Sequence, residues 1–230
     1  MRIGWSAAAY AAMLFLSIGH PPFAFADGEP AAGMTNPKSS TSLNDAAMQG
    51  LRLLRMIASQ DSFKQQTVFR AYGFDSPEQA SDLDLDRPLR VMLVPHDQLR
   101  DFKPGTDPNS LLVPLHEILF PVLAHGVVRT SMSVTFAQTD NRWKATGWGN
   151  PKLTRGFAQL EQYSASKTSF LVRIPALNLH LLGDHVQGEL LLTPIFDNPR
   201  YGFTAGKSLE AEKAFLILQP AAKARDNLPG

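Results

Sequence analysis

The sequence predicts an α+β domain, in which a mostly antiparallel, curved sheet packs against an N-terminal helix and one or two further helices. Three observations lead to this prediction. Residues 43–58 place apolar side chains at helical spacing, and residues 128–147 alternate apolar and polar side chains with the period of a strand. Helical and strand segments do not alternate strictly, which disfavours a parallel sheet. A cystatin-like or NTF2-like architecture is expected by analogy alone.

The first 26 residues have the order of a secretory signal peptide. Arg2 supplies a positive charge, an apolar run extends from Trp5 to Ile18, and Ala24-Phe25-Ala26 offers small residues for cleavage. A membrane-spanning helix needs about 20 apolar residues, whereas this run is shorter and is followed by two prolines. We therefore expect residues 1–26 to be removed, leaving a soluble periplasmic or secreted protein without a membrane span.

Composition excludes several classes of site. The chain has no cysteine, which removes disulfides, thiolate metal ligands and cysteine nucleophiles and favours a bacterial envelope protein over a small disulfide-rich one. The whole chain has 22 basic and 21 acidic residues, so loss of Arg2 leaves 21 against 21. A nucleic-acid-binding protein usually carries a basic patch, and none is visible here.

The domain boundaries follow from composition. Residues 27–41 are rich in Gly, Pro, Ser and Thr and predict a flexible N-terminus of the mature chain. A single α+β domain is expected over residues 42–220, followed by a flexible tail over residues 221–230. Ser42 or Thr41 stands where it can cap the helix that covers residues 43–58.

The remaining elements are predicted from periodicity, proline and glycine. Pro114 and Pro121 are expected to limit their surroundings to short strands. Pro175 is expected to interrupt a strand that then continues, and Gly183-Asp184-His185 to turn the chain. In order, the predicted elements are a helix at 77–81, strands at 89–94, 111–113 and 120–123, a hairpin of 128–136 with 143–147, a helix at 153–160, strands at 170–174, 177–181 and 189–195, and a helix at 208–218 whose last four residues could equally form a strand.

Trp148 is the first candidate for a binding surface. It lies between Gly147 and Gly149, and strict alternation places it on the face opposite Trp143. An exposed aromatic ring buries a large area on binding at low entropic cost, although a bulge or a helix could instead cover it. The candidate ligand-binding residues are Trp148, Leu171, Arg173 and Leu191.

A metal site is the alternative. His180, Asp184 and His185 are ligand types for zinc and similar ions, but their spacing is equally that of an ordinary hairpin with a polar tip. No serine stands in a G-x-S-x-G motif, and the stretch Gly202–Ser208 has one residue too few between its glycines for a phosphate loop.

The sequence therefore favours an exported, non-catalytic binding or accessory protein of the bacterial envelope over an enzyme. Its expected partner is a protein, a peptide or a small apolar ligand, and no cofactor is implied. A periplasmic metal-dependent hydrolase that uses His180, Asp184 or His185 is the alternative.

Overall fold

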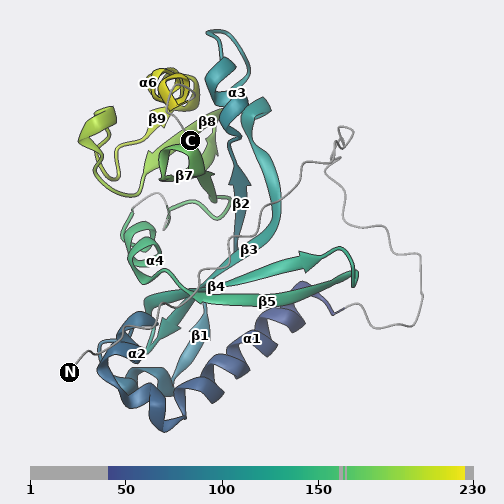
Figure 1. Ribbon diagram of the computed structural model, residues 1–230, viewed down its shortest axis with the longest axis vertical. Coiled ribbons are helices and arrows are strands. Elements are labelled where there is room, and N and C mark those ends of the chain that lie inside the picture. Colours follow the sequence, from purple (N-terminus) through teal and green to yellow (C-terminus); the bar gives the residue numbers. More distant parts are fainter. Residues whose placement is uncertain (1–40, 161–162, 164, 226–230) are drawn as a thin grey trace, which may run out of the picture. The chain divides into compact units, whose positions relative to one another are not determined.

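The protein forms a mixed α+β structure around one nine-stranded, mostly antiparallel sheet (Figure 1). The computed structural model describes residues 41–160, 163 and 165–225, and the predictions for the signal peptide and for residues 27–40 lie outside this range. The strands are β1 (Leu83–Leu85), β2 (Leu89–Leu93), β3 (Val113–Ala124), β4 (Val127–Ala137), β5 (Arg142–Gly149), β6 (Phe170–Ile174), β7 (Leu179–Val186), β8 (Glu189–Pro194) and β9 (Leu209–Glu210).

The strand order is β5-β4-β3-β2-β6-β7-β8-β9, with β1 beside β3. Strands β2 and β6 pair in parallel, and the other neighbours pair antiparallel. The predicted fold class is confirmed at this level. The helices of the described residues are α1 (Leu43–Ala58), α2 (Gln66–Ala71), α3 (His96–Asp101), α4 (Pro151–Ala158) and α6 (Ala211–Arg225), with short 3-10 turns at Asp61–Lys64, Pro77–Ser81, Pro108–Leu111, Pro175–Leu177 and Pro199–Tyr201.

Helix α1 packs on β5, β4 and β1. It begins as predicted after Ser42, whose hydroxyl oxygen accepts a hydrogen bond from the backbone N–H of Asp45 at 3.1 Å. Its apolar stripe is buried against the strands, and Figure 1 shows the helix lying obliquely to β5. The stripe consists of Ala46, Ala47, Gly50, Leu51 and Leu54.

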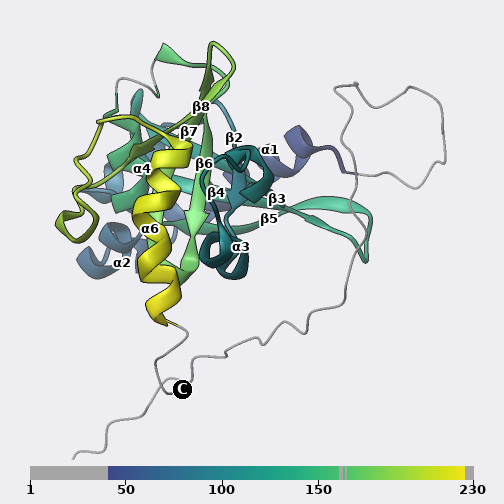
Figure 2. The ribbon, with the colours of Figure 1, turned by 90° about the horizontal axis from the view of Figure 1, so that it is seen from above.

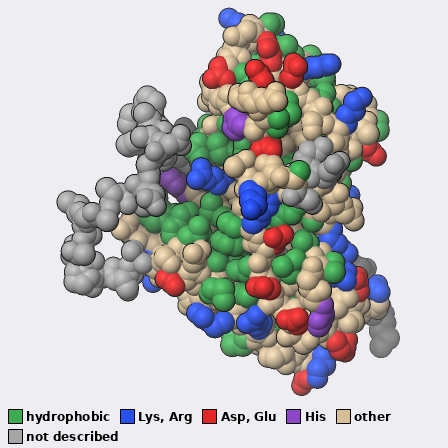
Figure 3. All heavy atoms as spheres, turned by 180° about the vertical axis from the view of Figure 1, so that it is seen from behind, with side chains coloured by type: hydrophobic (Ala, Val, Ile, Leu, Met, Phe, Trp, Pro, Cys, Tyr) green, Lys and Arg blue, Asp and Glu red, His purple; other side chains and the backbone are tan. Residues whose placement is uncertain are grey.

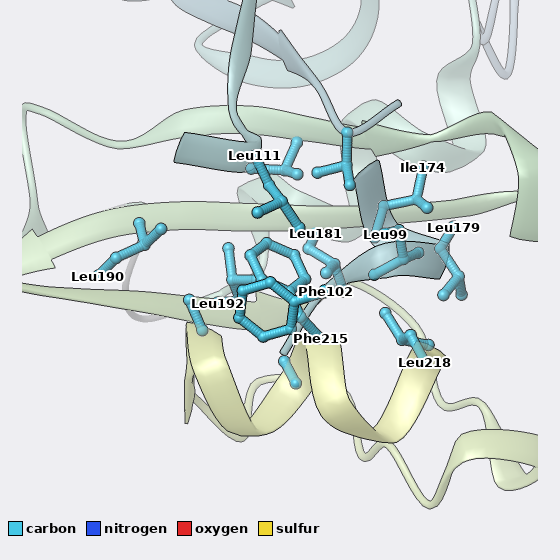
Figure 4. Close-up of a cluster of buried hydrophobic side chains, with 14 of the residues drawn as sticks. Leu99, Phe102, Leu111, Ile174, Leu179, Leu181, Leu190, Leu192, Phe215 and Leu218 are labelled. Atoms are coloured by element: carbon cyan, nitrogen blue, oxygen red, sulfur yellow. The ribbon is translucent and has the colours of Figure 1, made fainter. Parts of the chain in front are cut away.

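Helices α3 and α6 cover β6, β7 and β8 and lie beside each other in both ribbon views (Figures 1 and 2). Between helix and sheet, the rings of Phe102 and Phe215 meet edge to face with centroids 5.6 Å apart (Figure 4). Helix α6 continues to Arg225 through Pro220, beyond the predicted end of the helix, because Ala222 is still buried in this cluster.

Helix α4 covers the middle strands on the other face of the sheet. Leu153 and Phe157 are buried against side chains of β2, β3, β6 and β7. Gly156 allows the helix to approach closely, since a Cβ at this position would lie 2.6 Å from the ring of Phe196. The middle of the sheet is therefore covered on both faces.

Strand β3 corrects the prediction of two short strands broken by prolines. It is continuous through Pro114 and Pro121. Pro121 pairs with Ser131 of β4, and its carbonyl accepts a hydrogen bond from the backbone N–H of Asp86 on the opposite side. On that side the chain passes from β1 to β2, so the sheet loses little from the missing proline N–H.

The β6–β7–β8 region corrects the predicted turns. Strand β7 does not continue β6 but returns antiparallel to it, after Asn178 adopts a left-handed conformation with φ of 52°. Gly183 lies inside β7 and not in a turn. A Cβ there would stand 2.4 Å from the ring of Phe170, so glycine makes room for that ring. The turn itself comes later, at Gln187 and Gly188, which both have positive φ.

Among the described residues, no helix is long and apolar enough to cross a membrane.

A groove between helix α1 and the edge strand β5

Strand β5 forms one edge of the sheet, where among the described residues β4 is the strand that pairs with it. Its pairing with β4 shifts by one residue between Ala145 and Gly147, which marks a β-bulge at Thr146. The bulge restores Trp148 to the side of the sheet on which Trp143 lies, and both rings pack against the cluster beneath α1. The prediction that these two tryptophans face opposite sides is therefore wrong.

A groove of about 280 Å³ separates α1 from β5. It is the larger of the two best-defined hollows in the part of the chain that the structure describes. Its helix wall presents residues at the i, i+3, i+4 and i+7 positions, which share one face of a helix. The lining consists of Thr41, Ala46, Gln49, Gly50, Leu53, Arg142, Trp143, Lys144 and Ala145.

Gly50 sets the depth of the groove. A Cβ added to Gly50 would lie 2.4 Å from Sδ of Met132 and 2.6 Å from Cβ of Ala145. These distances are below van der Waals contact, so any larger residue would push α1 away from the sheet. Glycine here brings the helix close to the edge strand and places Leu53, which is 39% exposed, at the mouth of the groove.

An aromatic row crosses the sheet beside the groove. The ring of Trp143 on β5 lies 5.3 Å from that of Phe136 on β4, and Phe136 lies 6.2 Å from His116 on β3, measured between ring centroids. His116 is exposed and the other two rings are partly buried. Of these three residues Trp143 also lines the groove.

Charged side chains stand at the rim near the β4–β5 turn. The Asp140 carboxylate is held by Lys144 and lies 3.7 Å from Nε of Arg142. The hydrogen bond from Lys144, followed by its charge, lowers the pKa of Asp140 below its usual range. Two cations thus share one carboxylate, and these three side chains carry one net positive charge at neutral pH.

Apolar surface is accessible on the face of the molecule drawn in Figure 3, where hydrophobic side chains gather in the middle with charged side chains around them. Helix α1 contributes three exposed large apolar side chains of its own, Met48, Leu53 and Met56. Sequence reasoning missed this surface because it assigned α1 only its buried stripe. The available signal was that these three residues are apolar but lie outside the stripe.

Trp148 is the one predicted binding residue that lies near the groove. Its indole is partly buried, and its Nε1–H is buried without a hydrogen-bond partner among the described residues. Such a donor is costly to leave unpaired. Trp148 pairs with Met132 of β4, whose Sδ is the atom closest to a Cβ added at Gly50.

Leu171, Arg173 and Leu191 lie on the other face of the sheet from Trp148. Leu171 is fully buried beneath α4, whereas Leu191 is partly exposed. The structure therefore does not bring the four predicted residues into one site. Arg173 has a structural partner, since its guanidinium binds both carboxylate oxygens of Glu117 at 2.6 and 3.0 Å.

His180, Asp184 and His185 do not converge. All three belong to β7, where alternation places His185 on the face opposite the other two. Asp184 accepts a hydrogen bond from the Thr168 hydroxyl, and Nε2 of His185 bonds the side-chain oxygen of Asn109. Within the described ranges, no group of three His, Cys, Asp or Glu residues is placed to hold a metal ion.

The pKa of His180 is nevertheless shifted by its surroundings. It stands opposite Arg173 in the β6–β7 pairing. Burial, and then the positive charge of Arg173, lower the pKa of the imidazole below 6.5. A second, smaller hollow of about 130 Å³ adjoins it and is lined by Asn178, Leu179, His180, Leu181, Pro194, Phe196, Asp197, Asn198 and Phe203.

Comparison with known proteins gives no relative. No protein-family model, no curated protein and no solved structure matches the chain.

Proposed function

We propose that the protein is an exported, non-catalytic binding or accessory protein of the bacterial envelope that holds a peptide segment of a partner protein in the groove between α1 and β5. The observation that carries this proposal is the groove itself, in which a mixed helix face with Leu53 and Gln49 lies beside the edge strand of a sheet. Export rests on the signal-peptide pattern of residues 1–26.

A peptide suits this groove better than a compact small ligand. Small-molecule sites are usually enclosed and take up most of the ligand surface. Here the groove lies between a helix and a strand, and the rings of Phe136 and His116 follow Trp143 beside it. Grooves between a helix and an edge strand are a recurring way to bind extended peptides.

The alternative of a metal-dependent hydrolase has weaker support. It needs ligands gathered around one point, whereas His180 and His185 lie on opposite faces of β7. The cystatin-like or NTF2-like analogy remains a suggestion about architecture, and the proposal does not depend on it.

The proposal is tested by selecting peptides from a random displayed library with the full chain, expressed with export so that any processing occurs. Affinities of the enriched peptides are then measured in solution for three proteins, the wild type, Leu53→Lys and Met48→Lys. Leu53 lines the groove, whereas Met48 is on the same helix, is similarly exposed at 44% and does not line it.

We expect related peptide sequences to be enriched, to bind wild type and Met48→Lys with equal affinity, and to bind Leu53→Lys at least tenfold more weakly. Circular dichroism of all three proteins checks that the fold is retained. A library that yields no enriched sequence, or peptides that bind Leu53→Lys as well as wild type, would refute a peptide-binding groove.

A further inference from the structure

The outer edge of β5 has backbone groups positioned to pair with another strand. In an antiparallel strand, residues whose side chains share a face also direct their N–H and C=O groups to the same side. The backbone N–H of Trp143 donates to the carbonyl of Thr41, outside the sheet, at 3.4 Å. The backbone groups of Ala145, two residues on, therefore also point outward, toward the groove mouth.

One backbone group of this edge already has a partner within the protein. The carbonyl of Thr41, the residue just before the cap of α1, accepts the hydrogen bond from the N–H of Trp143. Among the described residues, the carbonyl of Trp143 and both backbone groups of Ala145 have no hydrogen-bond partner outside the β4 ladder. The bulge at Thr146 ends regular pairing directly afterwards, so the edge offers a short run only.

The two faces of this short run differ in chemistry. Trp143 and Ala145 direct their side chains toward α1 and the apolar groove. The side chains of Arg142 and Lys144 alternate with them and extend from the other face of the strand, although both residues also border the groove. A strand added here would therefore place one side chain beside Leu53 and its sequence neighbour beside the two cations.

We infer that the bound segment adds as a short strand to the outer edge of β5 and carries an acidic residue directly next to a large apolar residue. This inference rests on the proposed peptide-binding function and adds the binding mode and the residue pattern. The apolar side chain enters the groove beside Leu53, and the acidic one meets Arg142 and Lys144, which Asp140 alone leaves with one excess positive charge.

A second copy of this chain fits the same edge poorly. Symmetric antiparallel pairing about Ala145 would set each Lys144 opposite Thr146 of the other copy, so the two lysines would become diagonal neighbours on one face with no carboxylate opposite either of them. The bulge and the edge lysine are also features that limit open-ended strand pairing. Charge complementarity thus favours an acidic partner over self-association.

The test uses a positional-scanning library of acetylated hexapeptide amides against the full chain. We expect a preference for Asp or Glu at one position and for Phe, Leu or Met at its immediate neighbour. In the best peptide, replacing Glu by Gln should weaken binding at least fivefold for wild type and less than twofold for Arg142→Gln. N-methylation of the backbone should weaken binding more than tenfold at alternate positions only.

The outcomes separate the two proposals. Binding that Leu53→Lys abolishes, but without an acidic preference and without sensitivity to N-methylation, refutes strand addition and leaves the groove as a peptide site. A preference for Lys or Arg likewise refutes the inference. No binding by any pool refutes both. Concentration-dependent dimers that Arg142→Glu strengthens would show that a second copy is the occupant instead.

Discussion

Helices cover the same face of the sheet at both ends, but the two ends differ in how much apolar surface the helix leaves exposed and in the length of the edge strand. At the β6–β9 end, α6 buries Phe215 and Leu218 completely and exposes no large apolar side chain. Its edge strand β9 has two residues and leads directly into the helix. At the β3–β5 end, α1 exposes Met48, Leu53 and Met56, and the edge strand β5 has eight residues.

The α6 end is therefore a closed hydrophobic core, whereas the α1 end has exposed apolar side chains that a partner could cover. Both helices bury a stripe of small and large apolar side chains. The need for such a stripe therefore does not explain why α1 has further apolar residues exposed to solvent. Of these three residues Leu53 alone lines the groove beside the strand edge, where exposed apolar surface is an aggregation risk unless it contacts a partner. The α6 end should therefore govern stability, and the α1 end should govern binding.

The largest expected effect is at the closed end. Phe215→Ala removes a fully buried ring that contacts Phe102, and such changes typically cost about 3–5 kcal/mol of unfolding free energy. Urea denaturation measures the loss, with Met56→Ala on the open end as control, for which a change within about 0.5 kcal/mol is expected. Similar losses for both variants would contradict the comparison.

The second effect concerns the junction between the two ends. The Glu117–Arg173 ion pair reaches from β3 to β6 across β2, and Glu117 also accepts a hydrogen bond from Ser133 at 2.8 Å. Glu117→Gln leaves the guanidinium of Arg173, one quarter exposed, without its counter-charge. We expect a loss of about 2 kcal/mol, discounted for partial exposure.

Glu189→Gln serves as the control, because Glu189 is exposed on β8. If the ion pair couples the two ends, Glu117→Gln should also broaden the urea transition, which would then give different midpoints for tryptophan fluorescence and circular dichroism. All three tryptophans of the chain lie in the N-terminal 148 residues. Coincident midpoints with unchanged stability would show that the pair is dispensable.

A smaller effect is expected at the groove itself. Gly50→Ala gains up to about 1 kcal/mol in helix propensity but places a methyl group 2.6 Å from Cβ of Ala145, and overpacking costs about 1–3 kcal/mol. We expect a net loss of about 1 kcal/mol and weaker peptide binding. Gly147→Ala on β5 is the matched control, since nothing lies within 4 Å of its added Cβ. Equal behaviour of the two variants would mean that Gly50 does not set the groove.

The sequence predicted correctly those elements that depend on the local spacing of apolar residues. Alternation gave the β4–β5 hairpin, and helical spacing with Ser42 gave the start of α1. The turn near Gly183 was misplaced because glycine can serve either a turn or a close approach, and only the position of the Phe170 ring distinguishes them.

The groove was less predictable because it depends on long-range pairing. A one-residue bulge at Thr146 returns Trp148 to the side of Trp143, and alternation alone cannot reveal a bulge. That β5 is an edge depends on strand order, which local sequence does not encode. The three exposed apolar residues of α1 were visible in the sequence, but their meaning required the position of the strand beside them.

The smallest expected effect concerns His180, which pairs with Arg173 on the face of the sheet opposite α1. Burial and Arg173 lower the pKa of His180, so between that pKa and about 6.5 the unfolded chain binds more protons than the folded one. Stability contributed by His180 is thus fully present above pH 6.5 and decreases as the pH falls toward the folded pKa, by at most about 1.4 kcal/mol per pH unit. His180→Gln should lose this slope, and NMR titration of the imidazole should give a pKa below 6.5 that rises in Arg173→Met. An imidazole pKa at or above 6.5 in the wild type would mean that the ring is solvated and that this face is as open as the groove on the other side.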